Sequence, residues 1–344
     1  MKPSKYQEAI YKTFKLTKRD INISAVAGSG KTTVLLELLK YVPDKATSLF
    51  LAFNNSIVDE LKDRNTRRDA EIMTIHSCGW RSILCRYGSR AKMNPNKGIA
   101  KTEQVLKRMK DDIGDKQRGW FFFIIPKIID LLRCNLLENN QESIEWIAEH
   151  YDLNISEIEA KVAMEAFTLM QKDKSQFDFM DMIYQPVVDG SIRFRKYEYV
   201  FCDESQDFSR CQHEFIKRCL TRNGRLITVG DKRQAIYGFA GADAESYERL
   251  AEINGRAIKL PLSVSYRCAK SIVQEAQKIV PEISYAPHAI EGEVRDGSLL
   301  ELDYGDWILC RNLKPLIQAY LWLMKNKIKS KIRGKEIGEG ILAL

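Results

Sequence analysis

Several features that would assign a sequence to a class at once are absent from these 344 residues. No apolar run approaches the length of a membrane span, and the N-terminus, Met-Lys-Pro-Ser-Lys-Tyr, has no hydrophobic segment typical of a signal peptide. Internal repeats and low-complexity tracts are also missing. We therefore expect a protein that is not secreted and has no membrane partner. We place it in the cytoplasm, or in the nucleoid or nucleus if the source is eukaryotic.

Closely spaced cysteine pairs are a further absence. The chain has eight cysteines, scattered singly with no C-x-x-C pair: Cys78, Cys85, Cys134, Cys202, Cys211, Cys219, Cys268 and Cys310. This pattern indicates neither a zinc site nor a disulfide framework. We interpret the cysteines as reduced core residues.

The charge balance excludes little. There are 54 Lys and Arg against 46 Asp and Glu, a formal net charge of +8. Such a charge is compatible with nucleic-acid binding but does not establish it, because many proteins without that partner are equally basic. The apolar share of 44% and the charged share of 29% are typical of a soluble globular protein. The chain is longer than a domain with a single compact core usually is, so about two or three domains are expected.

The clearest positive signal is a phosphate-binding loop at residues 25–33, Ala-Val-Ala-Gly-Ser-Gly-Lys-Thr-Thr, directly after the apolar run Ile21–Ile23. It follows the pattern G-x-x-x-x-G-K-[ST], with Ala25 at the first glycine position. In such a loop, backbone N–H groups and the start of the next helix bind phosphate. Lys31 then reaches the β- and γ-phosphates, and the Thr32 hydroxyl binds Mg²⁺. The alternative, a chance Gly/Ser turn, is disfavoured by the strand pattern before it and the helical pattern after it.

Strand and helix patterns alternate at both ends of the chain but not in its middle. Residues 76–170 show only helical periodicity, so we predict a parallel α/β sheet interrupted by a helical insertion. The predicted strands are Ile21–Val26, Ser48–Phe53, Glu71–Thr74, Tyr197–Asp203, Arg225–Asp231, Ala257–Leu260 and Trp307–Arg311. The predicted helices are Tyr6–Phe14, Ser56–Lys62, Glu103–Lys110, Phe121–Leu132, Ser143–His150, Ala269–Ile279 and Leu313–Met324.

Two polar strand ends supply the second half of a nucleotide site. A hydrophobic strand runs into Asp203 and Glu204, and the carboxyl ends of parallel strands face the ligand crevice. Asp203 would bind Mg²⁺, and Glu204 would orient and deprotonate the attacking water. Gln234 follows the next strand and is placed to contact both the γ-phosphate and that water. The alternative for the acidic pair is an exposed turn.

An ordered series of segments resembles superfamily 1 DNA helicases of the UvrD/Rep type, including the branch with the F-box DNA helicases and phage-encoded relatives. The matching segments are Gln7, the loop at 25–33 (motif I), Leu51–Asn55 (motif Ia), Thr74–Ser77 (motif Ib), Phe177–Met182, Asp203–Asp207 (motif II), Val229–Ala242 (motif III) and Leu262–Arg267 (motif IV). The resemblance implies a RecA-like P-loop NTPase lobe, 1A, with an inserted helical subdomain, 1B, and a partial second RecA-like lobe, 2A. The expected divisions are 1–80 and 171–256 for 1A, 81–170 for 1B and 257–344 for 2A.

The resemblance also implies roles for residues of this sequence. Catalytic roles fall on Lys31, Glu204, Gln234 and Arg267. ATP would be bound by Gln7, Ala27, Gly28, Ser29, Gly30, Lys31, Thr32, Thr33, Tyr266 and Arg267, and Mg²⁺ by Thr32 and Asp203. Single-stranded DNA, or a junction of single- and double-stranded DNA, would be bound by Phe53, Asn54, Asn55, Thr74, His76, Tyr237 and Phe239.

The sequence departs from the family's pattern in three places. Phe239-Ala240-Gly241-Ala242 stands where Trp-Arg-Gly-Ala is usual, and Ile75 stands where phenylalanine is common. After Arg311 we find no motif V or VI, and Gly334–Ile341 resembles only the early part of lobe 2A. The α/β region beginning near residue 257 is also too short for a closed domain. We therefore expect an N-terminal portion of a longer protein.

Several side chains have a structural alternative. Tyr266 either stacks on adenine or packs in the core, and His76 either contacts the DNA backbone or is a buried structural histidine. Trp80 and Trp120 are interpreted as helical-core residues rather than base-stacking platforms. The insertion's basic residues are interpreted as a solvated face rather than a duplex-binding surface: Arg81, Arg86, Lys107 and Arg108.

The function expected from the resemblance is that of an ATP-dependent DNA helicase or translocase moving 3′→5′. The alternatives are a DNA-stimulated regulatory ATPase or DNA-binding module of a repair, phage or defence complex without unwinding, and a non-catalytic DNA-binding remnant. An RNA helicase fits Asp-Glu-Ser-Gln-Asp less well. Because motif VI supplies a second arginine finger, worth about 10³–10⁵ in rate in related enzymes, we expect these 344 residues to hydrolyse ATP slowly and not to unwind DNA.

Overall fold

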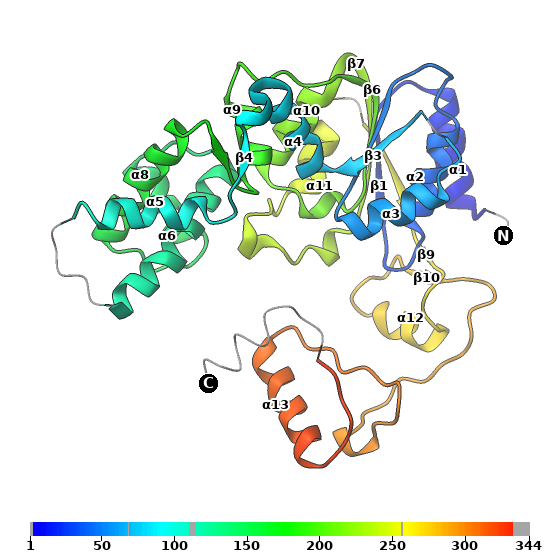
Figure 1. Ribbon diagram of the computed structural model, residues 1–344. Coiled ribbons are helices and arrows are strands. Elements are labelled where there is room, and N and C mark those ends of the chain that lie inside the picture. The colour runs from blue at the N-terminus through cyan, green and yellow to red at the C-terminus, as the bar shows by residue number, and fades with distance from the viewer. Residues whose placement is uncertain (1–2, 68, 110–114, 256, 333–344) are drawn as a thin grey trace. The chain divides into compact units, whose positions relative to one another are not determined.

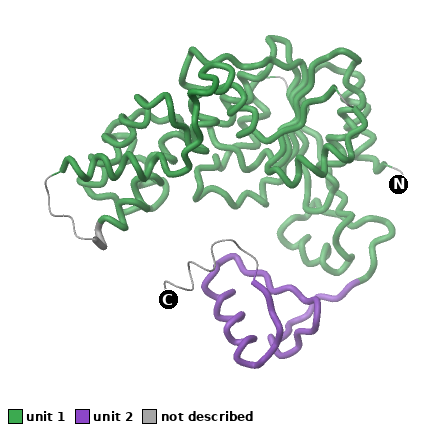
Figure 2. Tube along the Cα trace, in the orientation of Figure 1, with its two compact units in different colours: residues 1–291 green, residues 292–344 purple. Residues whose placement is uncertain are grey.

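The computed structural model describes residues 3–67, 69–109, 115–255 and 257–332. The chain forms two compact units, residues 1–291 and 292–344 (Figure 2). The expected lobe 2A segment Gly334–Ile341 and the end of the helix expected at Glu103–Lys110 lie outside the described residues. Within the described ranges, no helix is both long enough and apolar enough to cross a membrane.

A six-stranded parallel sheet forms the centre of the first unit (Figure 1). Its strands are β1 (Ile21–Ala25), β2 (Ser48–Ala52), β3 (Glu71–Thr74), β6 (Tyr197–Cys202), β7 (Leu220–Gly230) and β8 (Ile258–Leu262), in the order β3-β2-β6-β7-β1-β8. Because all neighbouring pairs are parallel, every strand carries its carboxyl end to the same edge. The expected parallel α/β fold is confirmed.

Alternating strand residues divide the core between the two faces of the sheet. Phe50 and Phe201 face α1 (Lys5–Leu16), α2 (Lys31–Lys40) and α3 (Asn55–Arg64), and Leu49 and Val200 face the other side. The other side is covered by α4 (Ile75–Tyr87), α9 (Asp181–Val188), α10 (Arg210–Cys219) and α11 (Ser246–Glu252), as Figure 1 shows. Both faces are buried, as a parallel sheet requires.

The helical insertion leaves and rejoins the sheet region through two short paired strands. They are β4 (Lys92–Met93) and β5 (Gln176–Phe177), which pair in parallel. Between them lie α5 (Lys97–Leu106), α6 (Asp115–Asn135), α7 (Gln141–His150) and α8 (Glu157–Lys172). Most of the described part of 81–170 is helical, as expected, but β4 lies within this range, and α4 runs through the expected boundary at residue 80.

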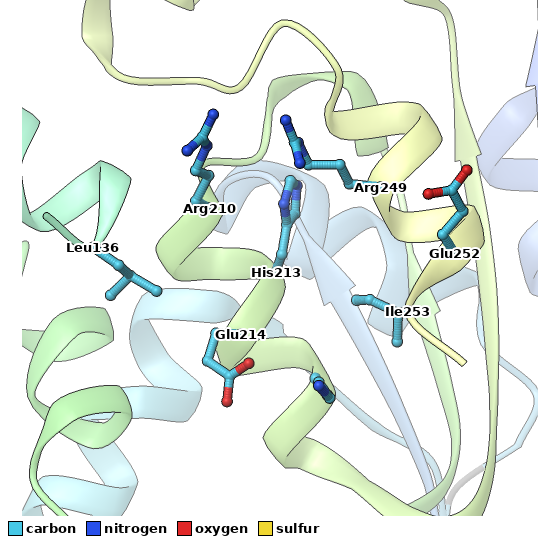
Figure 3. Close-up of a pocket in the computed structure, with 8 residues that line it drawn as sticks. Leu136, Arg210, His213, Glu214, Arg249, Glu252 and Ile253 are labelled. Carbon is cyan, nitrogen blue, oxygen red and sulfur yellow. The ribbon is translucent and has the colours of Figure 1, made fainter. Parts of the chain in front are cut away.

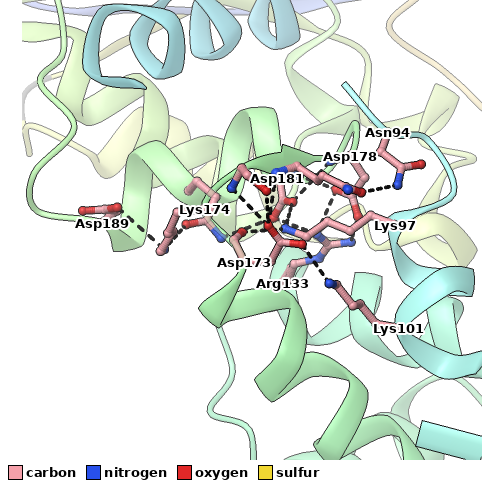
Figure 4. A network of polar contacts seen from close by, with 12 residues as sticks. Asn94, Lys97, Lys101, Arg133, Asp173, Lys174, Asp178, Asp181 and Asp189 are labelled. Atoms are coloured by element: carbon pink, nitrogen blue, oxygen red, sulfur yellow. Dashed lines mark hydrogen bonds and ion pairs between the residues drawn. The ribbon is translucent and has the colours of Figure 1, made fainter. Parts of the chain in front are cut away.

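A buried ion network fixes the point of re-entry (Figure 4). Arg133 of α6 donates to Asp178 from both terminal nitrogens, each at 2.9 Å, and contacts Asp181 at 3.1 Å. Lys97 of α5 donates to the other oxygen of Asp181 at 2.7 Å. Arg133 also pairs with Asp130. Because each buried charge has an opposite partner, the network ties two insertion helices to the segment that leads back to the sheet.

The remaining elements correct two strand predictions. Ala257–Leu260 was expected to open a second α/β region, but it lies in β8, which pairs with β1 in the first sheet. Trp307–Arg311, expected as a strand, has no regular structure. The other elements are β9 (Val264–Ser265), α12 (Lys270–Ala276), β10 (Ser284–Tyr285), α13 (Leu313–Lys325) and the 3₁₀ turns Gly88–Arg90, Ser205–Asp207, Lys232–Gln234, Gly238–Ala240 and Leu299–Glu301.

The expectation for the cysteines holds only in part. Five of them are buried: Cys78, Cys134, Cys202, Cys211 and Cys219. Cys268 is partly buried, whereas Cys85 and Cys310 are exposed. The interpretation as core residues is therefore wrong for Cys85 and Cys310, which lie on the outer side of α4 and in the irregular segment before α13.

Candidate nucleotide and DNA site

The phosphate loop joins β1 to α2 in a conformation that only glycine adopts without strain. Gly28 and Gly30 have φ values of +71° and +81°. Gly28 is also in close contact with the residues that directly follow β9, because a Cβ placed on it would lie 2.6 Å from the Cβ of Arg267. The backbone N–H of Tyr266 donates to the Gly28 carbonyl at 2.9 Å. The loop is thus attached to the segment that carries Tyr266 and Arg267.

The first two residues of α2 meet the acidic pair after β6. The Thr32 hydroxyl donates to Asp203 Oδ2 at 2.6 Å, and the Lys31 ammonium forms an ion pair with Glu204. Glu204 has a φ of +50°, so the chain turns sharply directly after the strand. The structure therefore brings together four predicted residues from segments about 170 positions apart.

Thr32 and Asp203 are a suitable oxygen pair for Mg²⁺. Asp203 is almost fully buried, and burial raises the pKa of its carboxyl, while the hydrogen bond from Thr32 acts in the opposite direction. A cation beside it would stabilise the ionised form. Mg²⁺ takes oxygen ligands and is usually held by one or two protein groups together with substrate phosphates. The two side chains present therefore fit the ion.

The remaining residues predicted to bind nucleotide differ in their exposure and in their contacts. Gln234 is exposed, and its amide donates to Asp231 at 2.7 Å at the end of β7. The Gln7 side-chain oxygen accepts the Ser4 backbone N–H at 2.9 Å, so this glutamine completes the capping box of α1. Arg267 is exposed and Tyr266 is half-buried. The Thr33 hydroxyl accepts from Arg64 of α3 at 2.9 Å.

Sequence reasoning missed an aromatic group beside Tyr266. Tyr11 of α1 lies one turn after Gln7, and its ring stands edge-on to Tyr41 with centroids 6.0 Å apart. Burial raises the pKa of Tyr11 to about 12, with Glu37, Tyr41 and Tyr266 as further causes. The four-residue spacing from Gln7 on one helix face was the available signal.

Three of the predicted DNA residues form an exposed aromatic row. Phe53 follows β2, and its ring lies 5.5 Å from that of Tyr237, which lies 6.4 Å from that of Phe239. The three side chains are 40%, 37% and 68% exposed. Exposed aromatic faces in a row are what successive unstacked bases require. The substitution of phenylalanine for tryptophan at 239 keeps this capacity.

The other residues predicted to bind DNA lie at the starts of helices. Asn54 caps α3 by accepting the Ile57 N–H at 2.9 Å, and Asn55 is the exposed first residue of that helix. Thr74 is buried and caps α4 by accepting the Ser77 N–H at 3.1 Å. His76 is partly buried, and burial lowers the pKa of its imidazole, which favours the neutral form.

The two tryptophans of the insertion differ. Trp80 packs edge-on against Phe177 at 6.2 Å, as expected of a core residue. Trp120 is 47% exposed and donates to Glu159, so the core interpretation is wrong for it. The four basic residues are all paired, Arg81 with Glu71, Arg86 with Ser191, Lys107 with Glu103 and Arg108 with Glu165.

A cavity of about 470 Å³ opens elsewhere on the first unit (Figure 3). Its lining comes from one face of α10, from α11 and from Leu136, and includes His213 between Arg210 and Arg249. His213 Nε2 lies 2.8 Å from Ser246 Oγ. Burial lowers the pKa of His213 to about 4. The cavity is lined by neither the phosphate loop nor the acidic pair.

A parallel sheet with a phosphate loop after β1, and with Lys31 and Thr32 meeting an Asp-Glu pair after β6, defines a RecA-like lobe of a P-loop NTPase. The family described as UvrD/REP helicase N-terminal domain matches residues 6–253. The chain belongs to this family, which is a family of DNA helicases.

Individual relatives cover most of the chain. It is 28% identical over 294 residues to the ATP-dependent DNA helicase PcrA of Bacillus subtilis (strain 168), covering 80% of this chain and 38% of that protein. Against PcrA of Staphylococcus aureus (strain Mu50) the identity is 26%, covering 77% and 38%. A probable DNA helicase II homolog of Mycoplasma capricolum is 24% identical over 305 residues, covering 78% and 40%. The chain thus spans about two fifths of the length of these relatives.

Proposed function

We propose that this chain is the nucleotide- and DNA-binding part of an ATP-dependent DNA translocase or helicase. The observation that supports this most is the meeting of Lys31 and Thr32 with Asp203 and Glu204 at the carboxyl edge of the sheet. The exposed aromatic row at Phe53, Tyr237 and Phe239 follows strands of the same sheet. The proposed phosphate site and the proposed stacking surface would therefore both follow strands of one sheet.

The chemistry assigned to the site is hydrolysis of the γ-phosphoryl bond. The loop at residues 27–30 and the N-terminus of α2 would hold the phosphates, and Lys31 would neutralise their charge. Mg²⁺, held by Thr32 and Asp203, would neutralise charge on the β- and γ-oxygens. Glu204 would accept the proton of the attacking water. Gln234 and Arg267, both exposed, would meet the γ-phosphate, while Gln7, Thr33 and Tyr266 would complete the nucleotide site.

The DNA part of the proposal depends on stacking and on backbone contacts. Successive bases of a single strand would stack on the aromatic row, each worth about 1–3 kcal/mol. Asn54, Asn55, Thr74 and His76 lie at the starts of α3 and α4, where free backbone N–H groups favour phosphate. We also propose that the protein moves along the strand with 3′→5′ polarity. It would reside in the compartment that holds DNA.

The test is a comparison of nucleotide binding, DNA binding and ATP turnover in this chain and in Lys31→Ala and Glu204→Gln. We expect nucleotide binding that requires Lys31, single-stranded DNA binding that does not, and slow hydrolysis that is lost in Glu204→Gln. Nucleotide binding unaffected by Lys31→Ala would overturn the proposal. A strand-displacement assay then separates a helicase from a DNA-stimulated regulatory ATPase. The exposed Ala240 at the usual arginine position instead motivates the third alternative, a non-catalytic DNA-binding remnant, which the nucleotide affinity tests.

A further inference from the structure

Gln206 occupies the centre of the turn that follows the catalytic carboxylate. The residue is only 4% exposed, although its side chain ends in a polar amide. Nε2 donates to Glu204 Oε2 at 3.0 Å and to Asp207 Oδ2 at 2.9 Å, and Oε1 accepts the backbone N–H of Asp231 at 3.0 Å. Both amide hydrogens and the oxygen are thus used, so the loss of a partner leaves a buried polar atom of Gln206 unpaired.

The same turn holds both ends of the segment that carries the stacking residues, residues 231–246, named here the aromatic segment. At its start, the Asp231 N–H donates to Gln206 Oε1. At its end, the Asp243 N–H donates to the Phe208 carbonyl at 3.0 Å. Ser246 Oγ donates to the Ser205 carbonyl at 2.6 Å.

Close packing makes these attachments stiff. A Cβ on Gly230, directly before the aromatic segment, would lie 2.8 Å from Gln206 Oε1 and 2.5 Å from Ser205 Oγ. Near the far end, a Cβ on Gly241 would lie 2.7 Å from Cys134 of α6. Because the segment has no slack at these points, a displacement of the turn has to be matched by a displacement of the segment.

Bound nucleotide would act on these contacts through Glu204. Its Oε2 is shared between the Lys31 ammonium and the Gln206 amide. If Lys31 turns to a phosphate, Gln206 remains as a partner of that oxygen. If Glu204 then turns toward water, the amide must follow it or leave a buried donor unpaired, which is costly. Either response changes the bonds of Gln206 to Asp207 and Asp231.

We propose that Gln206 is a positioning residue that couples the state of Glu204 to the aromatic segment, so that nucleotide binding alters the affinity for single-stranded DNA. This inference rests on the proposed function of the two sites. The buried amide would contribute to the coupling free energy between the nucleotide site and the DNA site. It would not contribute to the affinity of either site for its own ligand.

The experiment measures that linkage directly and needs no turnover. The affinity of the full chain for a fluorescently labelled oligo(dT) is measured by anisotropy, with and without a saturating non-hydrolysable ATP analogue and Mg²⁺. We expect the ratio of the two affinities to be about 5-fold or more in the unmodified chain, within the usual range of coupled sites. It should fall toward one in Gln206→Ala and Gln206→Met, while each ligand alone binds within about 3-fold of the unmodified chain.

Two variants keep the test decisive. Gln206→Met keeps the length and unbranched shape of the side chain while removing the donor to Glu204, and it leaves no cavity, so it remains informative if Gln206→Ala does not fold. Gln104→Ala, an exposed glutamine on α5, is the matched control and should keep the full ratio. Failure of the unmodified chain to bind either ligand would refute the proposed function. Binding of both without linkage, or full linkage in folded Gln206 variants, would refute only the role of Gln206.

Discussion

The Lys31 ammonium is held by the Glu204 carboxylate across the crevice between α2 and the turn after β6. The two side chains are mostly shielded from water, so their attraction is stronger than that of a surface pair. The proposed function assigns Lys31 to the phosphates and Glu204 to the attacking water. Bound nucleotide must therefore replace the Glu204 carboxylate with a phosphate as the partner of Lys31. Glu204 can act on the attacking water only after that replacement.

Glu204→Gln should separate binding from hydrolysis. Removal of the carboxylate charge weakens the hold on Lys31, so we expect nucleotide to bind as tightly as in the unmodified chain or more tightly. Hydrolysis should fall by about 10²–10⁴, the usual contribution of a general base. Lys31→Ala should instead lose about 10-fold or more in affinity, because a hydrogen bond to a charged group is lost. A fluorescent ATP analogue titrated with Mg²⁺ gives both affinities, and weaker binding in Glu204→Gln would contradict this account.

The two loop glycines should respond differently to alanine. Gly30 has open space around it, with only the Thr33 Cβ at 3.9 Å from an added Cβ, so Gly30→Ala should cost about 1–2 kcal/mol from its left-handed backbone alone. Gly28→Ala adds overlap with Ser265 and Arg267, at 2.8 and 2.6 Å, and should cost about 1–3 kcal/mol more. Urea unfolding of the two variants measures the difference. Equal losses would show that the segment at the end of β9 is not packed against the loop.

The local parts of the nucleotide site were predictable from the sequence, because each depends on a short run of residues. The loop needs small residues before Lys31, and the acidic pair needs only a buried strand before it. Parallel pairing then brings Thr32 and Asp203 together without further information, since strand ends share an edge. The contacts of Gln206 were not predictable, because they join the turn after β6 to the end of β7.

The errors have a common cause in long-range pairing. The run Trp307–Arg311 has the composition of a strand, but a strand of a sheet also needs a neighbouring strand, and this run has no regular structure, with Leu309 87% exposed. Ala257–Leu260 was correctly predicted as a strand and attributed to the wrong region, because its sequence does not show that β1 is its neighbour. Propensity specifies an element, whereas its partner is set by the whole fold.

Phe239→Ala should weaken single-stranded DNA binding without disturbing the fold, because the ring is 68% exposed. Loss of one stacked base is worth about 1–3 kcal/mol, which corresponds to about 5- to 150-fold in affinity. Phe123→Ala is the matched control, since this ring is 61% exposed on α6 and lies outside the aromatic row. Anisotropy of a labelled oligo(dT) compares the two variants. Equal weakening by both would mean that DNA does not follow the aromatic row.

The buried network at the base of the insertion should be far more sensitive than a surface pair. Arg133→Met leaves Asp178 and Asp181 without their shared partner and should cost about 3–5 kcal/mol. Lys107→Ala removes an exposed pair with Glu103 and should change stability little, because water screens such a pair. Chemical denaturation of both variants tests the contrast. A loss below about 1 kcal/mol in Arg133→Met would mean that hydration or protonation of the two carboxylates replaces the arginine at little cost.

His213 should make stability depend on pH in a defined window. Its ring is buried beside Ser246, and because the Ser246 hydroxyl donates to the Ser205 carbonyl, His213 Nε2 is assigned as the donor to Ser246. Burial lowers the pKa of the folded form to about 4, against about 6.5 for an unperturbed histidine. Between these values the unfolded chain binds more protons than the folded chain. The free energy of unfolding therefore falls as the pH is lowered from about 6.5 to about 4.

The size of that dependence follows from the shift, at about 1.4 kcal/mol per unit of pKa, or about 3 kcal/mol across the window. His213→Gln keeps an N–H donor for Ser246 but does not titrate, so its unfolding free energy should fall by about that much less between pH 6.5 and pH 4. His288→Gln, at an exposed histidine, should follow the unmodified chain. Denaturant unfolding at matched pH values gives the three curves. Parallel curves for His213→Gln and the unmodified chain would show that this imidazole is already protonated in the fold, with Asp243, 3.9 Å from its other nitrogen, as the counter-charge.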